Sequence, residues 1–408
     1  MDASTQTSPS AVDAELLGRY ADLLVVMGAN VQEGQIVDVR AGLEHAPLVR
    51  AVAESAYRRG ARYVDTTYVD PAIRRIRVLH AAEDTLDFAA PWERERFRQL
   101  GEQRCARIGI SPLVPPALLE GVDPARAGRE PSLPEAFQLL VERTTNWTVA
   151  PGPEPAWAAR VHPDLPEDDA LARLWEEVIQ MCRLDQRDPE RAWRARFAEL
   201  GAVTAALNDA RFDSLHFEGP GTDLTIGLLP TSIWMSGTGT TIDGIEFAPN
   251  IPTEEIFTAP DPERTEGVAT STRPLSLKGG ALITGLVVRF ERGRATQVDA
   301  ESGAEALREQ LRRDEGAPRL GEVALVDGRS GVGRLGTVFW NTLLDENAAA
   351  HLALGGAYSE SVGDADLERI NHSEIHIDFM VGSDEVEVTG VTTDGRSVPV
   401  LRGGDWQL

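Results

Sequence analysis

In the first half of the chain, short β-branched runs alternate with segments whose apolar residues recur at helical spacing. This pattern predicts a strand at Ile36–Arg40, an amphipathic helix at Ala46–Arg59 and a second strand at Ala61–Thr67. A strand, a helix and a strand in direct succession form a βαβ unit, which requires a parallel sheet with a right-handed crossover. A helix at Pro91–Gln103 and a strand at Cys105–Ile110 continue the alternation. We therefore expect an α/β N-terminal domain with a mostly parallel sheet.

The pattern changes in the middle of the chain. Residues 144–166 are rich in proline and include two tryptophans, and we expect them to form an ordered surface connection. Helices are predicted at Glu167–Leu184 and Pro189–Leu207, the second with Asp188 as its N-cap residue and proline in its first turn.

After Asn208 the chain consists of short β-rich runs separated by glycine and proline, interrupted by one short helix expected at Asn347–Leu354. The predicted strands are Ser214–Glu218, Thr222–Leu228, Gly280–Glu291, Gly321–Val326, Glu374–Val381 and Glu385–Thr393. The change in pattern puts a domain boundary between about 185 and 210. We expect a disordered tail at 1–12, the N-terminal domain at 13–200, and an α+β, β-rich C-terminal catalytic domain at 201–408.

The composition limits the classes of function. Asp and Glu total 65 against 40 for Lys and Arg, giving a formal charge of −25. A surface this acidic repels nucleic acid and anionic lipid, and no run approaches the roughly 18 apolar residues of a membrane span. The two cysteines, Cys105 and Cys182, exclude a disulfide scaffold and a thiolate zinc site. Because the polar N-terminus does not resemble a signal peptide, we expect a cytoplasmic protein with no nucleic-acid or membrane partner.

Three of the seven histidines lie in the last part of the chain, among acidic residues. The segment Glu374–Val381 alternates polar and apolar residues, so a strand would place His376 and Asp378 side by side on one face. Such a pair can bind one metal ion, or it can form an Asp–His hydrogen bond on a half-exposed strand.

Further acids occur in three other segments. In residues 341–358, Glu346 and His351 are five apart, so on a helix they share a target only if Glu346 lies at its start; Tyr358 follows two glycines. Glu322 begins a strand of apolar residues, as a solvated edge residue or as a ligand. Glu254 and Glu255 are adjacent, so in an extended chain only one of them can point into a given site.

Together these segments offer carboxylates and imidazoles in the number that two divalent ions, one carboxylate bridging them, would need. Pairs of metal ions are a recurrent device for hydrolysing peptides and phosphate esters. The sequence contains no serine or cysteine nucleophile motif and no phosphate-binding loop.

At these residues the chain resembles peptidase family M29, the thermophilic metalloaminopeptidases. The resemblance is carried by NIPTEEIFTAP, RRDEGAPRLGEVALV, FWNTLLDENAAAHLALGGAY and HIDFMVGS, which occur in this order, with 29 residues from Glu322 to His351 and 7 from His351 to Tyr358. It implies that a metal-bound hydroxide releases N-terminal amino acids from short peptides. The oxygen and nitrogen donors themselves would accept Zn, Co, Mn or Mg, with two divalent ions per chain. The metal ligands that the resemblance implies are Glu255, Glu322, Glu346, His351, His376 and Asp378.

Three further expectations complete this interpretation. Tyr358 would donate a hydrogen bond to the oxyanion, or it would only orient a ligand. Glu254, if not a ligand, would carry the proton from the attacking water to the leaving amine. The resemblance also implies a homodimer.

Two alternatives remain. A ring-cleaving dioxygenase of the 2,5-dihydroxypyridine type is similar to this family and needs one Fe(II), which His351, His376 and Asp378 could bind. The three additional glutamates argue against it, because a mononuclear site does not need them. The other alternative is a metal-binding or scaffolding protein without catalysis.

Overall fold

The computed structural model describes residues 14–111, 122, 126, 129, 133–277 and 281–408, so the tail expected at 1–12 lies outside the described residues. The chain forms two compact units. Unit 1 contains Met1–Trp193 and Thr238–Ile251, and unit 2 contains Arg194–Gly237 and Pro252–Leu408. The division into domains at 13–200 and 201–408 stays a prediction.

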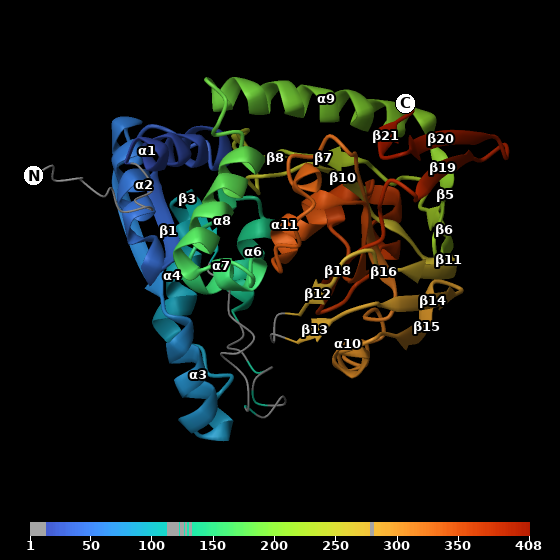
Figure 1. The fold of residues 1–408 in the computed structure, drawn as a ribbon, viewed down its shortest axis with the longest axis horizontal. Helices are drawn as coiled ribbons and strands as arrows, with labels where there is room; N and C mark the ends of the chain where they lie inside the picture. The colour runs from blue at the N-terminus through green and yellow to red at the C-terminus, as the bar shows by residue number, and fades with distance from the viewer. Residues whose placement is uncertain (1–13, 112–121, 123–125, 127–128, 130–132, 278–280) are drawn as a thin grey trace, which may run out of the picture. The chain divides into compact units, whose positions relative to one another are not determined.

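Unit 1 is built around a four-stranded sheet in the order β2-β1-β3-β4, in which all neighbouring strands are parallel (Figure 1). The strands are β1 (Ile36–Gly42), β2 (Tyr63–Val69), β3 (Ala106–Ser111) and β4 (Trp147–Pro151). The helices are α1 (Ala14–Leu23), α2 (Ala46–Arg58), α3 (Pro71–His80), α4 (Pro91–Glu102), α6 (Pro134–Val141), α7 (Pro155–Val161) and α8 (Glu167–Met181). Helix α2 packs against α1 and against β1 and β2. The expected α/β fold with a parallel sheet is confirmed.

The expectation of a surface connection at residues 144–166 is wrong. Trp147–Pro151 is strand β4, Pro155–Val161 is helix α7, and the side chain of Trp157 is fully buried. The prolines lie where a missing N–H is tolerated, because Pro151 ends an edge strand and Pro155 is the first residue of its helix. In this segment the prolines therefore lie at the ends of a strand and a helix, and they do not indicate a loop.

A buried polar pair in unit 1 gives a pH-dependent contribution to stability. His45 Nε2 lies 2.8 Å from the Gly152 carbonyl oxygen and 3.9 Å from the Glu154 carboxylate. Burial, with a smaller effect from the charge of Glu44, raises the pKa of Glu154 from 4.5 to about 7. The folded protein therefore binds this proton more tightly than the unfolded chain does.

We expect the contribution of Glu154 to be fully present below pH 4.5 and to be lost as the pH rises through 7. The loss should be on the order of 3 kcal/mol, because a tenfold change in proton affinity corresponds to about 1.4 kcal/mol. Glu154→Gln, uncharged at every pH, should unfold at a urea concentration that depends less on pH between 5 and 8. An equally strong pH dependence in the variant and the wild type would contradict this assignment.

Unit 2 consists mainly of two antiparallel sheets. One has eight strands in the order β15-β14-β11-β6-β5-β19-β20-β21, and the other has five in the order β18-β17-β16-β10-β7 (Figure 1). The strands of the first sheet, in chain order, are β5 (Phe212–Gly219), β6 (Thr222–Leu228), β11 (Pro260–Thr270), β14 (Val287–Glu291), β15 (Arg294–Asp299), β19 (Glu387–Thr392), β20 (Ser397–Arg402) and β21 (Asp405–Trp406). The strands of the second are β7 (Met235–Ser236), β10 (Glu255–Thr258), β16 (Leu320–Val326), β17 (His351–Gly355) and β18 (His376–Met380).

Short elements complete both units. Unit 1 has the two-stranded pair β8 (Gly239–Thr240) and β9 (Glu246–Phe247), and unit 2 has the pair β12 (Leu275–Ser276) and β13 (Leu282–Ile283). The remaining helices are α9 (Pro189–Ala210), in which unit 2 begins, α10 (Ala304–Gln310) and α11 (Thr342–Asp345). Among the described residues, no helix has the length and apolar composition that a membrane crossing needs.

The prediction of a helix at Asn347–Leu354 is also wrong. Helix α11 ends at Asp345, a single 3₁₀ turn follows at Glu346–Ala348, and His351–Gly355 is strand β17. This strand pairs with β16 on one side and with β18 on the other, and all its residues are buried. Pairing on both sides outweighs the helix propensity of its alanine and leucine residues.

Candidate metal centre

The five-stranded sheet has one apolar face and one polar face. Cross-strand partners, and residues two apart along a strand, point to the same side of a sheet. The apolar face packs into the core of unit 2 with Ile256, Val323, Leu325, Leu352, Leu354 and Phe379. The same register places five of the six expected ligands on the opposite face: Glu255, Glu322, His351, His376 and Asp378.

The side chains of these five residues lie close together. His351 Nε2 lies 3.0 Å from Glu255 Oε2 and 3.5 Å from Glu322 Oε1. His376 Nε2 lies 3.2 Å from Asp378 Oδ1. Their ligand atoms form two groups, each within 4.8 Å: one from Glu255, Glu322 and His351, the other from Glu322, His376 and Asp378. Glu322 belongs to both groups.

Both histidines are held so that Nε2 faces the carboxylates. His376 Nδ1 donates to the Gly356 carbonyl oxygen at 2.8 Å, and His351 Nδ1 lies 3.3 Å from the Ala349 carbonyl oxygen. A backbone carbonyl on Nδ1 leaves Nε2 available as a ligand, and this arrangement is usual for histidines that bind metals.

Glu346 lies on the 3₁₀ turn before β17, outside the sheet, but it is electrostatically coupled to the same cluster. Burial, followed by the charges of Asp378 and Glu255, raises the pKa of Glu346 well above its usual value. Burial also raises the pKa of Glu322. Carboxylates crowded away from water are unfavourable unless cations neutralise them.

The same carboxylates raise the affinity of both histidines for protons. Burial alone would lower the pKa of His376, but the charge of Asp378 and a hydrogen bond to it raise the pKa to about 10. Hydrogen bonds to Glu255 and Glu322 likewise outweigh burial and raise the pKa of His351. Divalent ions would have to displace these protons.

The donor set fits divalent ions. It consists of carboxylate oxygens and imidazole nitrogens without sulfur, because both cysteines lie buried in unit 1. Oxygen and nitrogen donors of this kind accept Zn, Co, Mn or Mg.

Tyr358 borders the cluster. Its ring centroid lies 5.2 Å from that of His376 and 6.1 Å from that of Phe257, which it meets edge-on. Its side chain is partly open to solvent at 43% exposure. Partial burial, followed by the charges of Glu322 and Asp378, raises the pKa of Tyr358 well above 10, so that its hydroxyl keeps its proton and can donate it in a hydrogen bond.

Glu254 lies apart from these groups. Its fully buried carboxylate accepts hydrogen bonds from Arg196 and from the backbone N–H of Gly331. Sequence reasoning missed Arg196 and also Asn347, which accepts the backbone N–H of Glu254. No local signal identifies Arg196, because it lies 58 residues from its partner.

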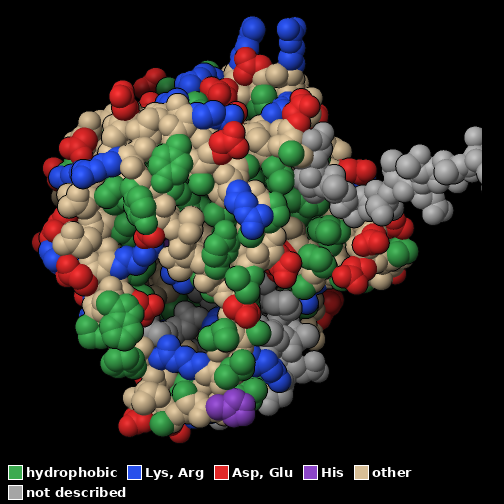
Figure 2. Space-filling model, turned by 90° about the vertical axis from the view of Figure 1, so that its left-hand side faces the viewer, with side chains coloured by type: hydrophobic (Ala, Val, Ile, Leu, Met, Phe, Trp, Pro, Cys, Tyr) green, Lys and Arg blue, Asp and Glu red, His purple; other side chains and the backbone are tan. Residues whose placement is uncertain are grey.

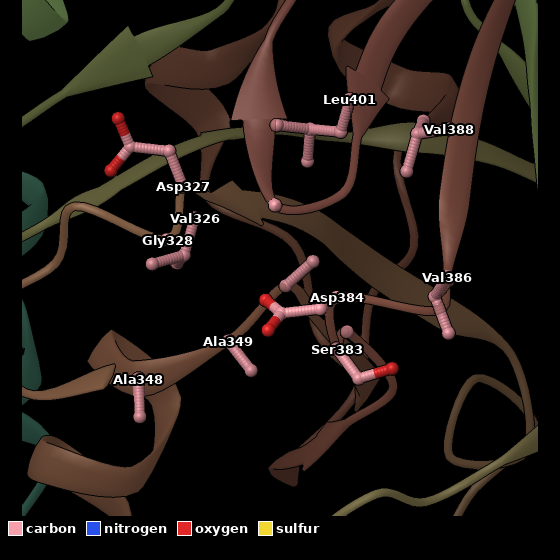
Figure 3. A pocket seen from close by; sticks show the side chains of 13 residues that line it. Val326, Asp327, Gly328, Ala348, Ala349, Ser383, Asp384, Val386, Val388 and Leu401 are labelled. Atoms are coloured by element: carbon pink, nitrogen blue, oxygen red, sulfur yellow. The ribbon is translucent and has the colours of Figure 1, made fainter. Parts of the chain in front are cut away.

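A small cavity of about 50 Å³ lies at one end of the five-stranded sheet (Figure 3). It is lined mainly by residues 326–328, 348–350 and 382–384, and its described lining includes none of the expected ligands. A cavity of this size holds a few water molecules. It is therefore too small to be a peptide-binding site.

The fold and the acid–histidine cluster define the class of a metal-dependent enzyme with an α/β unit and a strand-rich unit. Residues 13–406 match the family described as Thermophilic metalloprotease (M29). The chain is 44% identical to Aminopeptidase T of Thermus thermophilus over 96% of this chain and 98% of that protein. It is 38% identical to Aminopeptidase 2 of Geobacillus stearothermophilus over 96% and 97% of the two chains.

A solved structure of AmpT from Thermus thermophilus has the same fold, with a TM-score of 0.91 and 42% identity, and covers 97% of this chain and 99% of that one. The chain therefore belongs to the thermophilic metalloprotease family M29. It is a metalloaminopeptidase, a hydrolase that acts on peptides and depends on divalent metal. This result favours the hydrolase over the ring-cleaving dioxygenase and over a scaffold without catalysis.

Proposed function

We propose that this metalloaminopeptidase releases N-terminal amino acids from short peptides with two divalent ions per chain. The ligands would be Glu255, Glu322, Glu346, His351, His376 and Asp378. The observation that carries this proposal is the place of Glu322 in both groups of three ligand atoms, which suits a carboxylate shared between two ions. The four carboxylates would also balance the combined +4 charge of two ions.

Two divalent ions bound close together would lower the pKa of a water molecule and polarise the scissile carbonyl. The backbone carbonyls of Gly356 and Ala349 keep the histidine Nε2 atoms directed at the site. The protonated hydroxyl of Tyr358 would donate to the oxygen that gains charge during attack. The role of Glu254 as a proton carrier stays a prediction.

The test combines metal analysis with a substrate panel. The chain, freed of metal and reloaded with Zn, Co, Mn or Mg, should bind two ions by elemental analysis and hydrolyse aminoacyl-p-nitroanilides. N-acetylated substrates should resist, because the site would bind a free amine. One ion per chain at full activity would contradict the two-ion site, and cleavage of the acetylated control would contradict the aminopeptidase assignment.

Two expectations about how the protein exists in the cell, a homodimer and a cytoplasmic location, are kept as proposals. In support of a homodimer, unit 1 exposes large apolar side chains on β2, α3 and α4, among them Tyr68, Ile73, Ile76 and Trp92. Hydrophobic side chains lie between charged ones on the face of the molecule seen in Figure 2. Exposed apolar surface of this kind is common at sites of association.

Light scattering should give twice the mass of one chain. Replacing Ile73 and Ile76 together by aspartate should shift the protein toward the monomer, because both side chains are more than half exposed on α3 and would be buried in an interface. A dimer of unchanged stability on dilution would exclude α3 from the interface.

A further inference from the structure

A network of buried polar side chains joins the segments that carry the proposed ligands. Arg196 of α9 is 3% exposed, and its Nε donates to Glu254 Oε2 at 2.6 Å. Its Nη2 and Nη1 reach the two carboxylate oxygens of Asp327 at 2.6 and 3.3 Å. The other oxygen of Glu254 accepts the backbone N–H of Gly331 at 3.0 Å. Glu254 thereby connects the start of β10 to α9 and to the segment after β16.

Asn347 extends the network to the turn that carries Glu346. Its Oδ1 accepts the backbone N–H of Glu254 at 2.6 Å, and its Nδ2 donates to the Leu343 carbonyl oxygen at 2.8 Å. The backbone carbonyl of Asn347 accepts the Ser330 hydroxyl at 2.5 Å. The chain neighbours of Glu255 and Glu346 are thus bonded directly to each other.

This connection is relevant to the position of Glu346, because strand pairing does not fix that residue. Glu255 lies in β10 and is placed by strand pairing, whereas Glu346 lies on a 3₁₀ turn outside the strands. The bond between Glu254 and Asn347 is a short, fully buried link between these two segments.

Stability alone is a poor explanation for the network. Removing the charges of Arg196, Glu254 and Asp327 from water is unfavourable, and a buried ion pair often does no more than offset that cost. Asp327 also forms part of the cavity wall in Figure 3, with its carboxylate turned away from Ala349 and Ser383. The carboxylate is directed to Arg196. These buried polar groups therefore connect α9, the start of β10 and the segment after β16.

We propose that Glu254, Arg196 and Asn347 are positioning residues that set the separation of Glu255 and Glu346 and thereby the affinity for metal. This inference rests on the proposed function, since it takes Glu255 and Glu346 as ligands. It differs from the proton-carrier role expected for Glu254, because a positioning residue acts on metal binding and a proton carrier acts on turnover.

Glu254→Gln is the first variant. Arg196 and Gly331 donate to different oxygens of Glu254, and glutamine has an NH2 group in place of one of them. An N–H donor would then face one of these two donors, which loses its acceptor. Arg196→Lys is the milder second variant, because a lysine keeps the charge but cannot bind two carboxylates through a planar fork. Asp38→Asn is the matched control; it removes the charge of a buried carboxylate that pairs with the partly exposed Arg96 in unit 1, which carries none of the proposed ligands.

For each full-length variant we would measure Zn²⁺ or Mn²⁺ binding by calorimetry, the unfolding of the metal-free protein, and kcat at saturating metal. Glu254→Gln and Arg196→Lys should bind metal about 10- to 100-fold more weakly, as is typical when residues that support metal ligands are lost. Their kcat should return close to the wild-type value at saturating metal, and the control should bind metal as the wild type does.

Unchanged metal affinity in folded variants would overturn the inference. If kcat falls at saturating metal while affinity is unchanged, Glu254 is a proton carrier instead. If Glu254→Gln does not fold, the metal affinity of Arg196→Lys tests the inference. A wild-type protein that binds two ions but hydrolyses no peptide would refute the proposed function, and the change in affinity would still test the positioning role.

Discussion

Replacing Glu322 by glutamine should lower kcat/KM by about 10³-fold or more and should reduce the metal content. Glu322 Oε1 lies 3.5 Å from His351 Nε2, and Glu322 contributes a ligand atom to both groups of the cluster. Removing its charge would therefore weaken both ion positions at once. Metal ions supply several kcal/mol of transition-state stabilisation, and each 1.4 kcal/mol corresponds to a factor of ten in rate.

The measurements are metal content after dialysis and kcat/KM on an aminoacyl-p-nitroanilide. Glu177→Gln is a matched control, because Glu177 is also buried and lies 3.0 Å from a histidine, His162, but belongs to unit 1. The control should keep two ions and near wild-type activity. A Glu322→Gln protein that keeps both ions would show that Glu322 is not the shared ligand.

Much of the fold could be predicted from local pattern. The βαβ arrangement of β1, α2 and β2 follows from alternating periodicity over short distances, and it is confirmed. The strand carrying His376 and Asp378 was predicted in the same way, because period-two alternation already places both side chains on one face.

The wrong predictions concern segments whose secondary structure depends on pairing with strands that are distant in the sequence. His351–Gly355 has the composition of a helix, but its partners β16 and β18 are supplied by residues far away in the sequence. On a helix, Glu346 and His351 would point in different directions. Because His351 begins a strand and Glu346 lies on the turn before it, that restriction does not apply. Similarly, Pro151 and Pro155 suggested a loop because their positions at the ends of elements are visible only in the folded unit.

The choice between Glu254 and Glu255 shows the same limit. Alternation predicted that only one of the two could face the site, but it could not say which. The structure places Glu255 beside His351 and Glu254 beside Arg196, a partner that no sequence pattern connects to it. His351 and Arg196 are both distant from these glutamates in the sequence. Which glutamate faces the cluster therefore depends on the sheet register and on the position of α9.

Tyr358→Phe should lower kcat by about 10²- to 10³-fold while leaving metal content and KM close to wild type. The ring would keep its contacts with His376 and Phe257, so the change removes the hydroxyl alone. Loss of one preorganised donor to an oxyanion costs about 3–4 kcal/mol of transition-state stabilisation. Burial and the neighbouring carboxylates raise the pKa of Tyr358, which favours the protonated hydroxyl that a donor requires.

A second substitution separates donation from orientation. Tyr358→Leu removes the ring contact with His376 as well, so it should weaken metal binding in addition to lowering kcat. Tyr68→Phe, at a similarly exposed tyrosine in unit 1, should change neither quantity. If Tyr358→Phe kept full turnover and full metal content, the hydroxyl would have no part in stabilising the oxyanion. If Tyr358→Phe instead lost metal, the hydroxyl would act on the ions or their ligands, and the fall in kcat would disappear at saturating metal.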